Sequence, residues 1–198
     1  MIRLLLSIIL LVPSLAFSQL REKVVINSPI FKIIYNEKFQ QPTQVEYVVS
    51  CFNGTASRKG LDFYKVDSVK TSDAKDYEAN EWDKGHMAPA AAFSCSLETL
   101  KQTFSYLNCS LQNQYLNRGA WRLLEEHERT LSKQYGIINV RIDVEFKGTP
   151  VILATGARVP SGYVKTIVIP QTKQTIKYYF PNTKPVWSNF EQYKISKP

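Results

Sequence analysis

Apolar residues change their spacing twice along this chain, and these changes limit the folds open to it. Val24 to Tyr35 and Val45 to Phe52 are rich in Val, Ile, Phe and Tyr, as strands are. Helical spacing follows from Ser96 to Leu107 and from Leu111 to Tyr135. Strand-like segments then return between turn residues: Ile138 to Phe146, Val151 to Thr155, Tyr163 to Ile169 and Thr175 to Phe180. The pattern predicts an α+β fold in which strands flank a central helical section.

Two helices are predicted in that central section. Ser96 can cap the shorter helix, in which Leu and Phe recur at helical spacing. The longer helix is expected to have an apolar face of leucines and a solvated face of charged residues. The charged residues are Glu125, Glu126, Glu128 and Arg129. Gly119 inside this helix costs about 1 kcal/mol relative to Ala, which predicts that another group packs closely there.

The first residues resemble a secretory signal peptide. A positive charge precedes the almost continuously apolar run Leu4 to Leu15, and Ala16-Phe17-Ser18 offers small residues for cleavage. The run is shorter than the roughly 20 apolar residues that a bilayer span needs, although an uncleaved anchor is the alternative. We therefore expect a signal peptide at residues 1–18 and a single domain at 19–198. The mature protein is expected to be secreted or periplasmic, without stable membrane association.

The chain is basic, which bears on its partners. Its formal net charge is +8 at pH 7, from 25 Lys and Arg against 17 Asp and Glu. A basic surface raises the local concentration of polyanions and speeds their encounter. Nucleic acid, anionic lipid and acidic polysaccharide are therefore candidate partners, and charge alone does not choose among them.

Three cysteines, Cys51, Cys95 and Cys109, leave an odd thiol if one intramolecular disulfide forms outside the cytoplasm. We expect at most one bridge, and the pairing stays open. Because no Cys-x-x-Cys pair occurs, a structural zinc site is not expected. For Cys109, a nucleophile is the alternative to a small buried apolar side chain, and we favour the buried side chain.

The segment Asp83-Lys84-Gly85-His86 carries the most information, and a second block follows it. Asn108-Cys-Ser-Leu-Gln112 precedes Asn117-Arg-Gly-Ala-Trp121, which Glu125 follows. These blocks resemble the Asp-Arg-Gly-His motif and the later Asn, Asn, Trp and Glu positions of the DNA/RNA non-specific endonucleases. Upstream, Ala56-Ser57-Arg58 is similar to the arginine-bearing segment of that family. The resemblance implies a ββα-metal nuclease fold with a mixed or antiparallel sheet and a catalytic helix.

The chemistry explains why these residues belong together. Phosphodiester hydrolysis needs an activated water, a cation that neutralises charge on the phosphoryl oxygens, and positioned donors. His86 can accept the proton of the attacking water, because an unperturbed pKa near 6.5 leaves much of it neutral at pH 7. Mg²⁺ keeps several of its waters and needs few protein oxygens, and the resemblance assigns the one protein ligand to Asn117, with Mn²⁺ as a substitute. Glu125 lies eight residues beyond Asn117, so on a helix it comes near the metal waters and can orient them.

The resemblance also assigns roles to Asn108, Arg58 and Lys84. Asn108 is expected to hold the active-site backbone and the base. Arg58 and Lys84 are expected to bring positive charge to the scissile phosphate. Lys84 departs from the family, in which Arg is usual, because Lys keeps the charge and loses the bidentate fork.

Three further residues have structural interpretations. Asp83 is expected to cap a loop through its carboxylate. His127, the second of two histidines, is expected to lie at the surface. Trp121 is expected to pack in the core.

The predicted function is metal-dependent endonucleolytic hydrolysis of DNA and RNA without sequence specificity, since phosphate contacts carry no sequence information. The main alternative is a non-catalytic nucleic-acid-binding protein on a nuclease scaffold. The Lys84 departure favours that alternative, whereas the retention of His86, Asn117 and Glu125 opposes it. A cysteine hydrolase using Cys109 is a third alternative, for which no nucleophile motif is recognisable. Oligomeric state and any inhibitor protein stay open.

Overall fold

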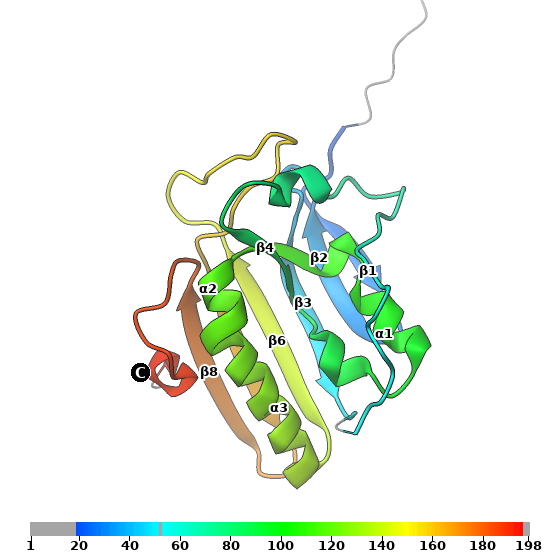
Figure 1. Cartoon of the computed structure of the whole chain (residues 1–198). Coiled ribbons are helices and arrows are strands. Elements are labelled where there is room, and N and C mark those ends of the chain that lie inside the picture. Colours follow the sequence, from blue (N-terminus) through cyan, green and yellow to red (C-terminus); the bar gives the residue numbers. More distant parts are fainter. Residues whose placement is uncertain (1–18, 52, 196–198) are drawn as a thin grey trace, which may run out of the picture.

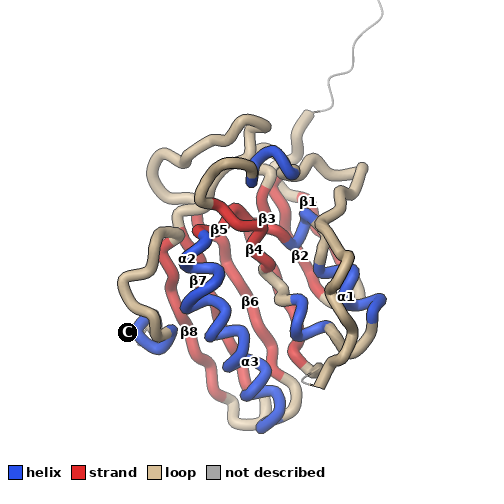
Figure 2. Tube along the Cα trace, viewed as in Figure 1, coloured by secondary structure: helices blue, strands red, loops and turns tan. Residues whose placement is uncertain are grey.

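The chain forms a six-stranded antiparallel sheet and a separate two-stranded sheet (Figures 1 and 2). The computed structural model describes residues 19–51 and 53–195, so the predicted signal peptide at 1–18 lies outside the described residues. The order of the large sheet is β1-β2-β3-β6-β7-β8. Its strands are β1 (Val24–Asn27), β2 (Phe31–Asn36), β3 (Gln41–Val49), β6 (Ile138–Glu145), β7 (Gly162–Ile169) and β8 (Gln174–Pro181). The small sheet pairs β4 (Trp82–His86) with β5 (Cys109–Asn113).

One long helix, α3 (Arg122–Tyr135), lies across one face of the large sheet (Figure 1). It continues from the short α2 (Gln114–Leu116) through a π-helical turn, η4 (Asn117–Trp121). The other helices are α1 (Leu97–Thr103) and the 3-10 turns η1 (Ala74–Tyr77), η2 (Ala90–Phe93), η3 (Tyr106–Asn108) and η5 (Phe190–Tyr193). Within residues 19–51 and 53–195, no helix has the length and apolar character to cross a membrane.

Alternating burial along the strands builds a core between the large sheet and α3. Every second residue of β6 from Ile138 to Val144 is buried. Leu124 and Leu131 of α3 belong to the same apolar cluster, and Trp121 at the end of η4 is 0% exposed within it. Each such side chain contributes about 1.5–3 kcal/mol when it leaves water. The predicted core position of Trp121 is therefore confirmed.

Much of the predicted secondary structure is confirmed. The α+β class holds, and β6, β7 and β8 each begin and end within one residue of the predicted strands. Ser96 caps α1, because its side chain accepts a hydrogen bond from the backbone N–H of Thr99. This helix ends at Thr103, four residues before the predicted Leu107, and η3 follows it.

The predicted helix from Leu111 to Tyr135 starts too early. Residues 109–113 form β5, and all five are buried. Because both faces of this strand are covered, its apolar residues follow neither helical nor alternating spacing. The predicted strand Val151 to Thr155 is also wrong. That segment makes only an isolated bridge between Ile152 and Arg158, and it turns at Gly156, whose φ is +95°.

The N-terminal strands differ from prediction as well. Val24 to Tyr35 divides into β1 and β2, because a turn intervenes in which the backbone N–H of Phe31 donates to the hydroxyl of Ser28. β3 begins four residues before the predicted Val45 and ends at Val49.

Two predictions about the helical segment are wrong. Glu128 was expected to be solvated, yet it is 0% exposed because Lys165 pairs with it inside the core. Gly119 was expected to meet a closely packed group, yet no atom lies within 4 Å of the position that a Cβ would take. Its backbone instead leaves helical geometry, with φ −104° and ψ −116°, within the π turn.

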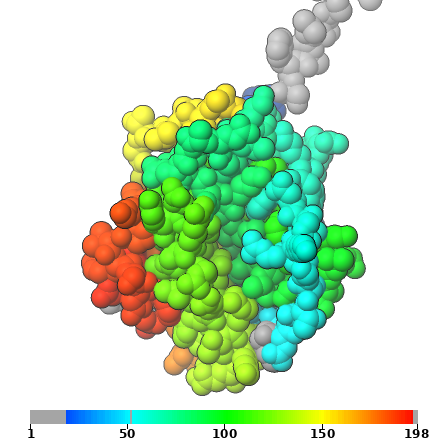
Figure 3. Space-filling view, in the orientation of Figure 1, coloured from blue at the N-terminus to red at the C-terminus, as the bar shows by residue number. Residues whose placement is uncertain are grey.

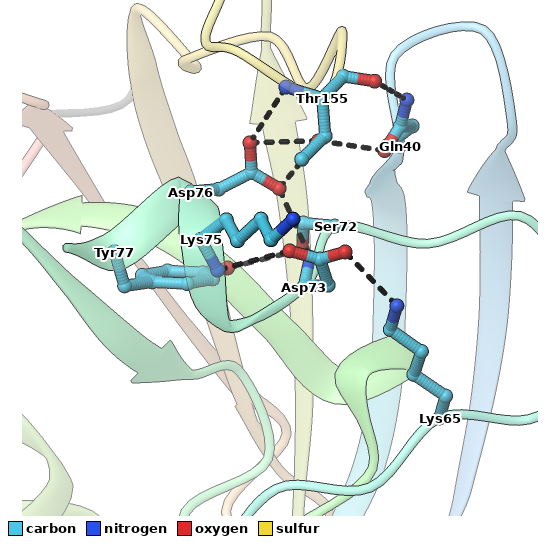
Figure 4. Close-up of polar contacts among 8 residues, drawn as sticks. All are labelled: Gln40, Lys65, Ser72, Asp73, Lys75, Asp76, Tyr77 and Thr155. Atoms are coloured by element: carbon cyan, nitrogen blue, oxygen red, sulfur yellow. Dashed lines mark hydrogen bonds and ion pairs between the residues drawn. The ribbon is translucent and has the colours of Figure 1, made fainter.

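A polar cluster ties η1 to a distant loop (Figure 4). Asp76 is 1% exposed, and the hydroxyl of Thr155 approaches its two carboxylate oxygens at 2.7 and 2.6 Å. The side-chain amide of Gln40 donates to the Thr155 carbonyl at 2.7 Å, and the Asp73 backbone N–H donates to Asp76 at 2.9 Å. Because an unpaired buried carboxylate is costly, this cluster fixes the path of the chain that leads into β4.

One disulfide joins Cys51 to Cys95, which agrees with the expected single bridge. Cys109 is a free, buried thiol, and burial raises its pKa to about 12. A thiol that stays protonated is a poor nucleophile. Cys109 is therefore the buried side chain that we favoured.

Removing the disulfide should destabilise the fold strongly. The bond closes a loop between residues 44 positions apart. The chain-entropy relation then predicts that the Cys51→Ser/Cys95→Ser variant loses about 4 kcal/mol of unfolding free energy. Urea unfolding of the variant and of the reduced parent chain measures this loss. A loss of unfolding free energy below about 1 kcal/mol in both proteins would show that the disulfide does not lower the entropy of the unfolded chain by the expected amount.

Candidate active site

A cavity of about 890 Å³, lined by charged side chains of both signs, lies between β4, the loop of residues 58–63 and the helical segment 117–129. Figure 3 shows the loop of residues 53–63 in cyan and the helix in light green on one face of the molecule. The cavity walls contain most of the site residues predicted from the sequence: Arg58, Lys84, His86, Asn117 and Glu125. The exception is Asn108, which is 0% exposed and does not line the cavity.

The small sheet places His86 in the cavity wall. β4 pairs with β5 so that His86 lies opposite Cys109 and Gly85 lies opposite Ser110. A Cβ at Gly85 would come within 2.4 Å of the Gln112 side chain, so only glycine fits. The backbone at Gly85 is an extended strand and makes no turn. Glycine is required there because a neighbouring side chain packs onto its Cα.

His86 sits among aromatic rings and keeps an unused nitrogen. The ring centroids of Phe63 and Phe104 lie 4.7 and 4.9 Å from that of its imidazole. Its Nε2 atom is buried and has no hydrogen-bond partner among the described residues. Burial, together with the charge of Arg58, lowers the pKa of His86 to about 3. The imidazole is therefore neutral at physiological pH and can accept a proton.

Asn108 fixes the backbone that follows His86. Its side-chain oxygen accepts from the Ala88 N–H at 2.8 Å, and its amide nitrogen donates to the carbonyls of Ala88 and Thr103 at 2.9 Å. Its own carbonyl accepts from the Met87 N–H at 2.9 Å. Asn108 thus positions the chain next to the histidine without reaching the cavity.

Asp83 orients Asn117. The side-chain amide nitrogen of Asn117 donates to Asp83 at 2.9 Å, and the Arg118 guanidinium donates to the same carboxylate at 2.8 and 2.6 Å. Since the amide nitrogen is engaged, the amide oxygen is the end of Asn117 that is left for a cation. The expectation that Asp83 caps a loop is wrong, because Asp83 lies in β4 and binds across to η4.

Glu125 contributes a buried carboxyl group to the cavity wall. Its Oε1 atom has no hydrogen-bond partner among the described residues. Burial raises the pKa of Glu125 to about 7, although the charge of Lys165 opposes the shift. The expectation of a solvated helix face at Glu125 is therefore wrong. Its expected closeness to Asn117 fits the common cavity that both residues line.

Two arginines in the cavity wall were missed from the sequence. Arg122 and Arg129 line the cavity together with Glu125. They stand three residues before and four residues after Glu125, which places all three on one helix face. This spacing was the available signal, but Arg129 was expected on the solvated face and Arg122 was assigned no role.

Lys84 is held by neighbouring groups. Its ammonium nitrogen lies 3.2 Å from Asp62 and 5.7 Å from the ring centroids of both Phe63 and Tyr106. His127 is only partly exposed, and its ring packs against Phe190 at 5.1 Å between centroids. It does not line the cavity.

The donor set of the cavity suits one weakly coordinated hard cation. Among the described residues, no group of three or more His, Cys, Asp or Glu side chains could hold a metal ion. The amide oxygen of Asn117 and the unpartnered carboxyl oxygen of Glu125 are oxygen donors, the kind that Mg²⁺ prefers. Mg²⁺ commonly keeps several waters and needs one or two protein oxygens. The residues present therefore fit such an ion.

Comparisons with known proteins agree with this geometry. Residues 14–197 match the family described as DNA/RNA non-specific endonuclease. Mitochondrial endonuclease G of Bos taurus is 34% identical over 85 residues, which make up 41% of this chain and 28% of that protein. Nuclease C1 of Cunninghamella echinulata var. echinulata is 30% identical over 144 residues, which make up 64% of this chain and 57% of that protein.

A solved structure gives the match in three dimensions. A chain in the crystal structure of the EndoG/EndoGI complex superposes with a TM-score of 0.77 and 25% identity, covering 91% of this chain and 82% of that one. The predicted ββα-metal nuclease fold is thereby confirmed. The sequence match to endonuclease G is shorter, since it spans 28% of the bovine protein and 29% of the human one.

The neutral state of His86 can be measured directly. We expect its imidazole to titrate with a pKa of about 3 in the metal-free protein, as observed by NMR of the ring signals. The unfolded chain takes up this proton near pH 6.5, so the buried neutral ring makes the fold lose stability as pH falls from about 6.5 toward 3. His127→Gln removes the other histidine and is the control for assignment. A midpoint above pH 6 for the remaining ring would contradict the burial of His86.

Proposed function

We propose that this chain, which belongs to the DNA/RNA non-specific endonuclease family, hydrolyses phosphodiester bonds of DNA and RNA in the cavity described above. The observation that carries the proposal is the combination of an unpartnered, neutral His86 with Asn117 and Glu125 in the wall of one cavity. A binding protein has no need for a buried proton acceptor beside a cation site.

His86 acts as the general base. Its imidazole takes the proton from the attacking water. The lowered pKa keeps it unprotonated in the free protein, and the negative charge of a bound phosphate would raise that pKa toward the value that suits a general base. Phe63 and Phe104 hold the ring in place, and Asn108 fixes the following backbone. A positioned base of this kind typically contributes about 10² to 10⁴ in rate.

Asn117 is the protein ligand for one divalent cation, Mg²⁺ or Mn²⁺. The cation, when bound, supplies charge neutralisation for the phosphoryl and leaving oxygens. Asp83 holds the Asn117 amide so that its oxygen is the free end. The Glu125 carboxyl group, whose Oε1 atom has no partner among the described residues, would orient the waters of a bound cation.

The cations of the cavity wall bind the substrate backbone. Arg58, Arg122 and Arg129 present guanidinium groups, which suit phosphate oxygens geometrically. Lys84 adds a point charge that Asp62 holds at 3.2 Å. Because phosphate contacts carry no sequence information, both DNA and RNA are accepted without sequence preference.

We also propose that the protein is exported. The signal-like segment 1–18 supports this, and so does the Cys51–Cys95 disulfide, since such bonds persist in oxidising compartments. The endonuclease G relatives are named as mitochondrial. Fractionation of the source cells, with immunodetection of the chain, separates export from residence in an organelle or the cytoplasm.

The purified chain should nick plasmid DNA and degrade RNA only with a divalent cation. Mg²⁺ or Mn²⁺ supports the reaction because the protein's own groups do not neutralise all the charge that develops on the phosphate. Gel assays with each metal and with excess chelator measure this dependence. Full activity in chelator would remove the cation from the mechanism. Binding without cleavage under every metal condition would establish the non-catalytic alternative.

Variants of the base and the ligand should differ in their response to metal. His86→Ala should lose about 10² to 10⁴ in rate with little change in nucleic-acid affinity. Asn117→Ala should also lose rate, but part of its loss should return at higher Mg²⁺ because only the metal site is weakened. Added cation cannot replace a proton acceptor, so His86→Ala should show no such recovery.

Metal-titrated kinetics of the two variants decide between these roles. His127→Gln is the matched control, since it removes the histidine outside the cavity and should keep the parental rate. Equal recovery of the His86 and Asn117 variants by Mg²⁺ would show that base and ligand are misassigned.

A further inference from the structure

An ion pair is buried completely beneath the helix that carries the candidate site. The Lys165 ammonium of β7 donates to Glu128 of α3 at 2.7 Å, and both side chains are 0% exposed. The Tyr47 hydroxyl of β3 donates to the other carboxylate oxygen of Glu128 at 2.8 Å. Lys165 also lies 4.0 Å from the ring centroid of Trp121. We call these four residues, Tyr47, Trp121, Glu128 and Lys165, the buried ion cluster.

Each side chain of this cluster stands where an apolar residue would satisfy the pattern. Lys165 interrupts the inward-facing row of β7, whose neighbours in that row, Tyr163 and Ile167, are 0% exposed. Glu128 occupies the sheet-facing side of α3 together with Leu124 and Leu131. Apolar replacements of a buried ion pair are often neutral or stabilising, because two charges no longer have to leave water. Stability alone therefore does not account for this cluster.

The cluster contacts the helical segment on both sides of Glu125. Trp121 precedes Glu125 by four residues and Glu128 follows it by three. Tyr47 and Lys165 come from β3 and β7, which lie on either side of the central strand β6. Glu128 thus bridges the two strands over β6. Hydrogen bonds at 2.7 and 2.8 Å have narrow geometry, so they fix the rotation and translation of the helix on the sheet more tightly than apolar contacts do.

The position of the helix decides where Asn117 and Glu125 point. Both residues line the cavity, and η4 between them departs from regular helical geometry at Gly119. A helix with such an interruption is less constrained by its own hydrogen bonds, so its placement depends more on what it packs against. Displacements near 1 Å can cost about 100-fold in rate at a site that needs exact geometry.

We propose that Tyr47, Glu128 and Lys165 are positioning residues, which hold the α3 helix in the one register on the sheet that brings Asn117 and Glu125 to the cavity together. The inference rests on the proposed nuclease function. It assigns a role to three residues that do not line the cavity.

The test replaces the cluster by apolar residues of similar volume. In the triple variant Tyr47→Phe/Glu128→Leu/Lys165→Met, no charge is left unpaired, so the fold should form with an unfolding midpoint near or above that of the parent. We expect kcat for plasmid cleavage at saturating Mg²⁺ to fall about tenfold or more, with KM within about twofold. A purely structural role would change the midpoint and leave kcat unchanged. A triple variant that folds and keeps the parental kcat overturns the proposal.

Two further single variants test the positioning role even if the triple variant does not fold. Tyr47→Phe removes one hydrogen bond and leaves the Glu128–Lys165 pair intact, so it folds even if the triple variant does not. A lower kcat at constant KM in Tyr47→Phe supports the proposal, and an unchanged kcat opposes it. Ser132→Ala is the matched control on the same helix, because it deletes the single hydroxyl proton that lies within reach of the carbonyls of Val49 and Gly136, away from the cavity. It should lower the midpoint and keep kcat.

The outcomes separate this inference from the function on which it rests. A parent chain without cleavage activity would refute the proposed function, and the positioning role with it. An active parent with an equally active triple variant would refute only the positioning role. If Ser132→Ala loses as much kcat as the triple variant, any weakening of the α3 packing has the same effect. That outcome also refutes the positioning role.

Discussion

The geometry of the candidate site depends on the contact between the helical segment 117–135 and the large sheet. Trp121, Leu124 and Leu131 bury one side of this segment against the sheet, and each contributes about 1.5–3 kcal/mol of burial. The neighbouring side of the same segment holds Asn117 and Glu125 in the cavity wall. Because one continuous segment is buried on one side and lines the cavity on the next, the packing of the core also sets the geometry of the candidate site.

The cavity wall combines cationic side chains with a histidine that stays neutral. Under the proposed function the arginines and Lys84 attract phosphate, and the charge of Arg58 adds to burial in keeping His86 unprotonated. The loop that carries Arg58 has no regular secondary structure, and the Cys51–Cys95 disulfide and the hydrogen bond from Ala56 N–H to the Ser94 carbonyl hold it. The charge of Arg58 would thus serve both substrate attraction and the protonation state of the proposed base.

The sequence predicts the parts of the fold in which one periodic pattern decides the structure. β6, β7 and β8 alternate or run apolar between clear turns, so their bounds follow from the pattern. β5 is buried on both faces and carries no period, which is why the helix was started too early at Leu111. Glu128 was assigned to solvent because its partner Lys165 is distant in the chain, and no local pattern reveals a buried pair.

The candidate site was predicted from the motif residues. What the prediction missed depends, like the Glu128–Lys165 pair, on contacts between residues distant in the sequence. His86, Asn117, Glu125, Arg58 and Lys84 do meet in one cavity. The role of Asp83 could not be inferred, since its hydrogen bond to Asn117 joins β4 to η4 across 34 positions of sequence. A crystal soaked in Mn²⁺ shows whether Asn117 holds one cation in this cavity, as the proposed function requires. One anomalous peak should lie within bonding distance of the Asn117 side-chain oxygen, and a peak bound only to other residues would exclude Asn117 as the ligand.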